Sequence, residues 1–81
     1  MPSFRITPRD ENTEPVIIDA ERIEEAATIY ARRLYSGDVF ARRETGTPRL
    51  SGMFQAYRNL PLTSAGARAA AVGSWFHAGP A

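Results

Sequence analysis

The chain has 81 residues, with ten basic and nine acidic side chains and a net charge of +1, which excludes an acidic DNA mimic and a histone-like polycation. Cysteine is absent, so disulfides, thiolate metal sites and cysteine nucleophiles are excluded as well. No apolar run approaches the roughly 20 residues that span a bilayer, and no apolar signal segment follows Met1. We therefore expect one small cytoplasmic domain over residues 1–81, with no membrane partner.

Two short strands are predicted before residue 20. Ser3–Thr7 alternates the apolar Phe4 and Ile6 with polar residues, which is the period of a half-buried strand. Pro15–Ile18 is a β-branched run, and the polar segment 8–14 separates the two. The pattern predicts an antiparallel hairpin with a loop of about seven residues.

The clearest element is a helix from Ala20 to Tyr35. Asp19 is the expected N-cap, because a carboxylate accepts hydrogen bonds from the free N–H groups of the first turn, and Gly37 is expected to end the helix. Apolar residues recur with the helical period, which predicts one face buried on a sheet: Ile23, Ala26, Ala27, Tyr30, Ala31 and Leu34.

A second hairpin is predicted after this helix. Val39–Glu44 and Leu50–Arg58 both alternate, and Thr45–Pro48 reads as the turn between them. Among the aromatic residues of this hairpin, Phe40 and Phe54 are assigned to the core.

The last third of the sequence predicts less regular structure. Asn59–Thr63 contains a proline and indicates a loop, whereas the alanines of Ser64–Ala71 favour two helical turns. Val72–His77 is expected to form a final strand, and Ala78–Ala81 to be frayed. The expected fold class is α+β: a small antiparallel sheet of four to five strands, in the chain order β-β-α-β-β-(β), packed on one amphipathic helix.

No residue pattern indicates catalysis, a metal or a cofactor. His77 is the single histidine and has no carboxylate or hydroxyl beside it in sequence, and Gly46 and Gly52 do not form a phosphate-binding loop. Three glutamates in the predicted helix favour a solvated face that complements the helix dipole, and the alternative is an acidic contact surface for a basic partner: Glu21, Glu24 and Glu25. Because so short a chain also has little core to spare for a deep cavity, we expect a protein that is not an enzyme.

Charge is distributed unevenly along the chain. Residues 1–30 hold seven acidic residues and three arginines, a balance of −4, and residues 31–81 hold two acidic residues and seven arginines, a balance of +5. All ten basic residues are arginines, which bind carboxylates and phosphates with two parallel hydrogen bonds as lysine cannot.

The second predicted hairpin collects the candidate partner-binding residues, which are Arg42, Arg43, Arg49, Arg58 and Tyr57. Three interpretations fit them: an ordinary solvated hairpin, a face or edge that binds a protein, and a basic aromatic surface for single-stranded nucleic acid. The last is the weakest, because strand alternation directs Arg42 and Arg43 to opposite faces.

In size, in arginine usage and in the layout of residues 3–58, the chain resembles small proteins of phages and mobile elements, among them the anti-CRISPR proteins. The stretch Ile17–Ala26 is similar to their strand-into-helix junctions. The resemblance implies an inhibitor or adaptor that occludes a larger protein or ribonucleoprotein complex, a CRISPR-Cas complex, in the cytoplasm of a host bacterium. The alternative is a small nucleic-acid-binding regulator that uses the arginine-rich hairpin. A homodimer formed by pairing of an exposed hairpin edge would add to a marginal core.

Overall fold

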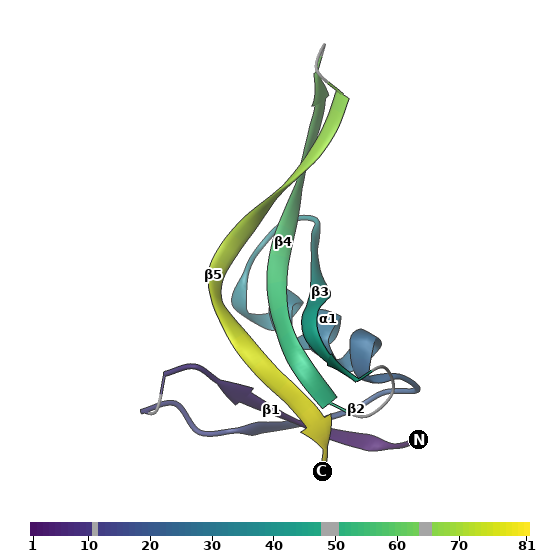
Figure 1. Cartoon of the computed structure of the whole chain (residues 1–81). Helices are drawn as coiled ribbons and strands as arrows, with labels where there is room; N and C mark the ends of the chain where they lie inside the picture. The colour runs from purple at the N-terminus through teal and green to yellow at the C-terminus, as the bar shows by residue number, and fades with distance from the viewer. Residues whose placement is uncertain (11, 48–50, 64–65) are drawn as a thin grey trace.

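The computed structural model describes residues 1–10, 12–47, 51–63 and 66–81. Its strands form one antiparallel sheet in the order β2-β1-β5-β4-β3, and α1 covers one face of that sheet (Figure 1). The α+β class, with an antiparallel sheet and one helix, is confirmed. The elements are β1 (Ser3–Pro8), β2 (Val16–Asp19), α1 (Ile23–Leu34), β3 (Val39–Thr47), β4 (Ser51–Thr63) and β5 (Gly66–Pro80).

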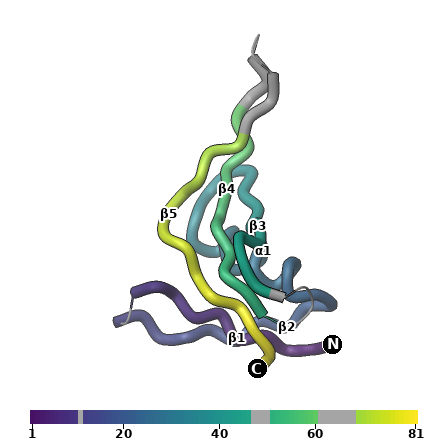
Figure 2. The backbone as a smooth tube through the Cα atoms, viewed as in Figure 1, coloured from purple at the N-terminus to yellow at the C-terminus, as the bar shows by residue number. Residues whose placement is uncertain are grey.

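The first hairpin forms as the alternation of its residues predicts. β1 pairs antiparallel with β2, and Phe4 and Ile6 turn toward the helix, where they are buried. The other neighbour of β1 is β5, the last strand of the chain, which lies in the middle of the sheet (Figure 2). Alternation along a strand predicts which side is buried, but it does not identify the neighbouring strand.

The helix begins at Ile23, three residues after the predicted start. The prediction that Asp19 caps it was wrong: Arg22 occupies the N-cap without a side-chain hydrogen bond. Asp19 remains in β2 and accepts a hydrogen bond from the Ser3 hydroxyl, because pairing with β1 continues to this residue. Gly37 has a φ of 90° in the turn that leads to β3, a conformation that glycine adopts readily.

The core lies between α1 and the sheet. Leu34 was wrongly assigned to it: at the last residue of α1, it lies over a hollow beside β5 and is 53% exposed. The other five predicted helix positions are buried. The larger buried cluster joins four of them to all but the third strand: Phe4, Ile6, Ile18, Ala20, Ile23, Ala26, Ala27, Tyr30, Phe54, Phe76 and Ala78. The fifth, Ala31, packs in a second cluster with Val39 and Ala56.

The second predicted hairpin is also present. β3 pairs with β4 from Val39↔Arg58 to Thr47↔Ser51, and the register shifts by one residue between Arg43 and Thr45. Thr45–Thr47, predicted as part of the turn, continue β3, while Pro48 and Leu50 lie outside the described residues. Phe54 is completely buried, but Phe40 is not in the core, because its side chain lies on the face opposite α1.

The structure contradicts both predictions for residues 59–71. Asn59–Thr63 continues β4 instead of forming a loop, and Gly66–Ala71 is strand instead of helix; Ser64 and Ala65 lie outside the described residues. The helical preference of alanine is a weak local effect, and here the pairing of β5 with β4 overrides it.

The C-terminal segment is not frayed. The prediction of a strand at Val72–His77 is confirmed, but β5 continues to Pro80, and Ala78 and Gly79 are buried. The segment is fixed because β1 pairs with it, and the N–H of Ala81 donates to the carbonyl of Ser3.

Residues 59–63 of β4 and 66–71 of β5 extend past α1 and past the start of β3 as a two-stranded ribbon (Figure 1). We call these two segments the ribbon. It accounts for the elongated shape of the molecule, whose principal extents are 43 × 27 × 21 Å. Among the described residues, α1 is the single helix, and it is too short and too polar to cross a membrane.

Candidate binding surface on the open face of the sheet

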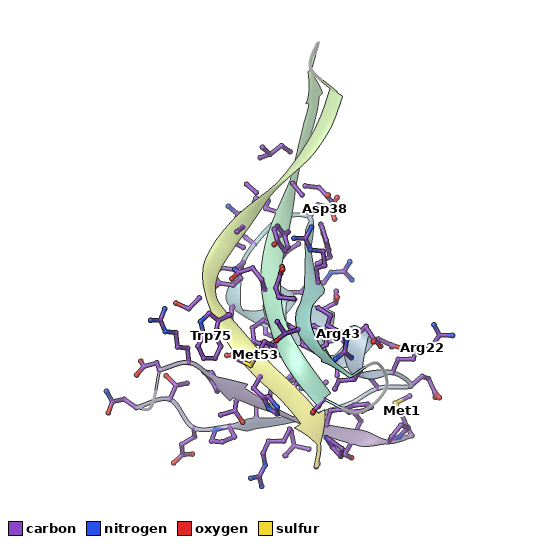
Figure 3. The ribbon with its side chains drawn as sticks, in the orientation of Figure 1. Met1, Arg22, Asp38, Arg43, Met53 and Trp75 are labelled. Atoms are coloured by element: carbon purple, nitrogen blue, oxygen red, sulfur yellow. The ribbon has the colours of Figure 1, made fainter. Side chains whose placement is uncertain are left out.

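The face of the sheet opposite α1 is not covered by any described element. In Figure 3, Met53 lies on this open face and α1 passes behind the sheet. One antiparallel sheet face packed on a core and the other in solvent is a common arrangement. Strand register places the following side chains on the open face: Arg5, Thr7, Ile17, Phe40, Arg42, Thr45, Met53, Gln55, Tyr57 and His77.

An aromatic pair forms the centre of the candidate site. Phe40 and Tyr57 are register partners in β3 and β4, and their rings stack with centroids 5.7 Å apart. The guanidinium of Arg42 lies 4.3 Å from the centre of the Tyr57 ring and donates a hydrogen bond of 2.6 Å to its hydroxyl. Cation–π attraction and this hydrogen bond hold both side chains in place. We call Phe40, Arg42, Glu44 and Tyr57 the outer cluster.

Glu44 completes the outer cluster. Its carboxylate accepts a hydrogen bond of 2.5 Å from the Tyr57 hydroxyl and lies 3.2 Å from a guanidinium nitrogen of Arg42. The hydrogen bond from Tyr57, and then the charge of Arg42, hold the pKa of Glu44 below its ordinary value. The same hydrogen bond raises the pKa of Tyr57. At neutral pH the outer cluster therefore carries one positive and one negative charge beside an uncharged phenol.

Arg43, the next residue in the chain, turns to the other side and is used internally. Its two terminal nitrogens donate to the carbonyl of Ser51 at 2.7 Å and to the carboxylate of Glu24 at 3.1 Å. Its guanidinium also lies 4.8 Å from the centre of the Phe54 ring. The side chain is 16% exposed, and Figure 3 shows it beside α1. Arg43 thus fastens β3 to α1 and to the start of β4.

Glu24 shows the electrostatic effect of this contact. Its partial burial alone would raise the pKa of its carboxyl, but a backbone hydrogen bond and Arg43 together bring the pKa below the ordinary value of 4.5. The ion pair between Arg43 and Glu24 is therefore part of the packing of α1 against the sheet.

The remaining predicted site residues do not join the outer cluster. Arg58 lies on the helix side, where its Nε donates to the carbonyl of Ser36 at 3.3 Å. Arg49 lies outside the described residues. Of the five predicted residues, the structure brings together Arg42 and Tyr57. Sequence reasoning missed Phe40 and Glu44 as site residues, although alternation places both on the same face as Arg42.

A second concave region lies on the helix side of the sheet, between α1, the β1–β2 loop and β5. This hollow encloses about 790 Å³. Trp75 and Leu34 are among its lining residues, and they are 41% and 53% exposed. The guanidinium of Arg9 lies 5.6 Å from the centre of the Trp75 ring. Within the described ranges, no group of three or more acidic, histidine or cysteine side chains is placed to hold a metal ion.

No protein-family model matches the chain, and no curated protein matches it either.

Proposed function

We propose that the chain is a non-enzymatic protein-binding module, which acts as an inhibitor or adaptor by covering a surface of a larger protein or ribonucleoprotein complex. The observation that carries this proposal is the outer cluster: two stacked aromatic rings and an arginine, held by hydrogen bonds on an uncovered sheet face. Tyrosine and arginine are enriched among the residues that dominate binding energy at protein interfaces. Because the side chains are already fixed, binding loses less conformational entropy.

The placement of the arginines favours a protein partner over nucleic acid. Binding to a phosphate backbone requires several unpaired cations along one face. Here Arg42 is paired with Glu44, and Arg43 faces the helix and is paired with Glu24. A cluster with balanced charges and aromatic surface is better suited to a mixed polar and apolar protein surface than to a polyanion.

The nature of the target rests on the resemblance to anti-CRISPR proteins, which makes a bacterial CRISPR-Cas effector complex the first partner to test. Inhibition by occlusion requires affinity and a surface large enough to block access. It requires no catalytic group on the inhibitor. The outer cluster supplies the anchor for such a surface, and the neighbouring open-face residues Gln55 and Met53 extend it.

The experiment compares three full-length proteins. Wild type, the double variant Arg42→Glu with Tyr57→Ala, and the control Arg33→Glu are each titrated against purified effector complexes, with binding and target cleavage as readouts. Arg33 is exposed at the end of α1, on the side of the molecule away from the outer cluster. Wild type and the control should bind alike, and the double variant should bind at least about tenfold more weakly.

Equal binding by the double variant and the wild type would contradict the site. A titration with single- and double-stranded oligonucleotides at two salt concentrations tests the alternative. Binding that weakens steeply with salt, and weakens again with Arg42→Glu, would support the nucleic-acid-binding regulator in place of the protein-binding module.

A further inference from the structure

Two of the edges of this sheet are protected against pairing with another strand. On the outer edge of β3, the N–H of Ala41 donates to the hydroxyl of Thr28 at 3.1 Å, and the carbonyl of Val39 accepts from Nε of Arg32 at 3.0 Å. Side chains of α1 therefore occupy backbone groups that another strand would need. The edge at β2 is four residues long and follows Pro15. Short or covered edges are common ways to prevent unwanted pairing.

β5 has a longer edge that is not protected in these ways. β1 pairs with β5 from Phe76 to Pro80 and no further. Residues 66–72 therefore have β4 on one side and no described strand on the other, and the register with β4 shifts between Val72 and Phe76. Among the described residues, those of β4 make all the hydrogen bonds to residues 69–75, through the backbone and through the side chain of Gln55.

Register identifies the backbone groups that face this open edge. The N–H of Ala41 points away from β4, so its partner Ala56 directs its backbone groups toward β5. Ala56 is paired with Val72, and Arg58, two residues later, with Ala70, so Val72 and Ala70 face β4. Ala69 and Ala71 alternate with these residues. Their N–H and C=O groups therefore point to the open edge of β5.

The ribbon has the composition of a segment that is buried in an assembly. Residues 59–71 contain one charged residue, Arg68, although Leu60 and Ala69–Ala71 are exposed. A two-stranded ribbon is marginally stable at best in water. Its two edges also differ, because Pro61 removes an N–H group from β4, whereas the exposed segment of β5 has no proline before Pro80.

We propose that a second copy of this chain pairs along the open edge of β5. The two β5 strands run antiparallel about a twofold axis near residues 69–71, and Ala69 and Ala71 exchange backbone hydrogen bonds with the same segment of the other copy. The sheet then continues from one copy into the other. Self-pairing is favoured by charge, since residues 69–75 contain no charged side chain, and no like charges meet.

The hollow extends this contact. The open edge of β5 runs from Ala71 to Val72, where the register with β4 shifts, and Gly73 and Trp75 in the shifted stretch line the hollow. A few paired residues alone would bury less than the roughly 1,200–2,000 Å² of a stable interface, and the exposed Trp75 and Leu34 beside the edge offer additional apolar area. This proposal does not depend on the outer cluster.

The first test measures the mass of the full chain in solution by light scattering over a range of concentrations. Wild type should have the mass of two chains. The double variant Ala69→Pro with Ala71→Pro lacks the outward N–H groups, keeps the groups that face β4, and should have the mass of one chain. The matched control Ala69→Ser with Ala71→Ser keeps both N–H groups and should remain a dimer. Circular dichroism establishes that each variant is folded.

A second measurement stands even if the proline variant fails to fold. A single cysteine introduced at position 70, which lies on the proposed axis, in a chain that has none, should form a disulfide-linked dimer, whereas Arg33→Cys should not. Arg42→Glu should leave the dimer intact, which separates this proposal from the proposed function. A monomeric wild type, a dimer that survives the proline substitutions in folded protein, or no crosslinking on β5 would overturn the proposal.

Discussion

The two faces of the β3–β4 hairpin use the same residue types for different purposes. On the face toward α1, Arg43 lies over the ring of Phe54, and both side chains are enclosed by the core and by α1. On the open face, Arg42 lies over the ring of Tyr57, which stacks on Phe40, and these side chains contact solvent. Each face therefore has a guanidinium over an aromatic ring and a carboxylate beside it.

The two arginines differ in how far a partner could contact them. Arg43 donates to a backbone carbonyl and to a helix residue, so its removal would disturb the fold. Arg42 binds residues of the hairpin itself and is 59% exposed, so a partner can contact it without displacing any other element. Because successive side chains of a strand point to opposite faces, Arg43 contributes to stability and the adjacent Arg42 is available for binding.

The phenylalanines should show the largest difference between the faces. Phe54→Ala should lower the free energy of unfolding by about 3–5 kcal/mol, because it leaves a cavity in the core. Phe40→Ala should lower it by about 1 kcal/mol, close to the value of an aromatic pair. Urea unfolding of both variants measures this. Equal losses of unfolding free energy in the two variants would mean that Phe40 is packed as tightly as Phe54.

The helix offers a second comparison. Ile23→Ala should cost about 2–4 kcal/mol, since Ile23 is 1% exposed in the core. Leu34→Ala should cost about 0.5 kcal/mol, as expected for an exposed position. Thermal and urea denaturation of the two variants provide the measurement. A large loss for Leu34→Ala would mean that this side chain is packed in solution.

Substitution of Arg43 should have the larger effect on stability, and substitution of Arg42 the larger effect on binding. Arg43→Ala should lower the free energy of unfolding by about 1–2 kcal/mol, because two hydrogen bonds of a charged group are lost. Arg42→Ala should lower it by about 0.5 kcal/mol or less, as for exposed ion pairs. In a binding assay, Arg42→Ala should be the more damaging substitution. The comparison between the faces fails if one arginine dominates both measurements.

The smallest expected effect is on the stability of the fold at acidic pH. Since the pKa of Glu24 in the folded protein lies below 4.5, its carboxylate stabilises the fold above that pH, and the contribution is lost as the pH falls through the folded pKa. The stability difference between wild type and Glu24→Gln should therefore narrow from neutral pH to well below 4.5. In an Arg43→Ala background, the pH dependence of this difference should be smaller. A difference that does not change with pH would contradict the ion pair.

Local patterns predicted the elements whose neighbours are close in sequence. The period of Ile23, Ala26 and Ala27 predicted the buried helix face, and alternation predicted both hairpins and the opposite directions of Arg42 and Arg43. The same alternation put Phe40 beside Arg42. Its assignment to the core failed because aromatic character was given more weight than strand position.

The failures share a physical cause, which is pairing between distant residues. The alanines at 69–71 form a strand because β4 lies opposite them, and Ala78 is buried because β1 and β4 flank it. Neither partner is adjacent in the chain. The candidate site was predicted in part for the same reason. Arg42 and Tyr57 meet diagonally across one hairpin, but the helix contact that occupies Arg43 spans 19 residues.

The position of β5 has a consequence for how the chain acquires its structure. The β1–β2 and β3–β4 hairpins form from neighbouring residues, but within the sheet they are joined through β5 alone. The two hairpins therefore remain separate in the sheet until residues 66–80 pair with both. Folding should be limited by these long-range contacts, and so be slower than for a helical domain of equal size. During synthesis, the sheet would close only after this final strand had left the ribosome.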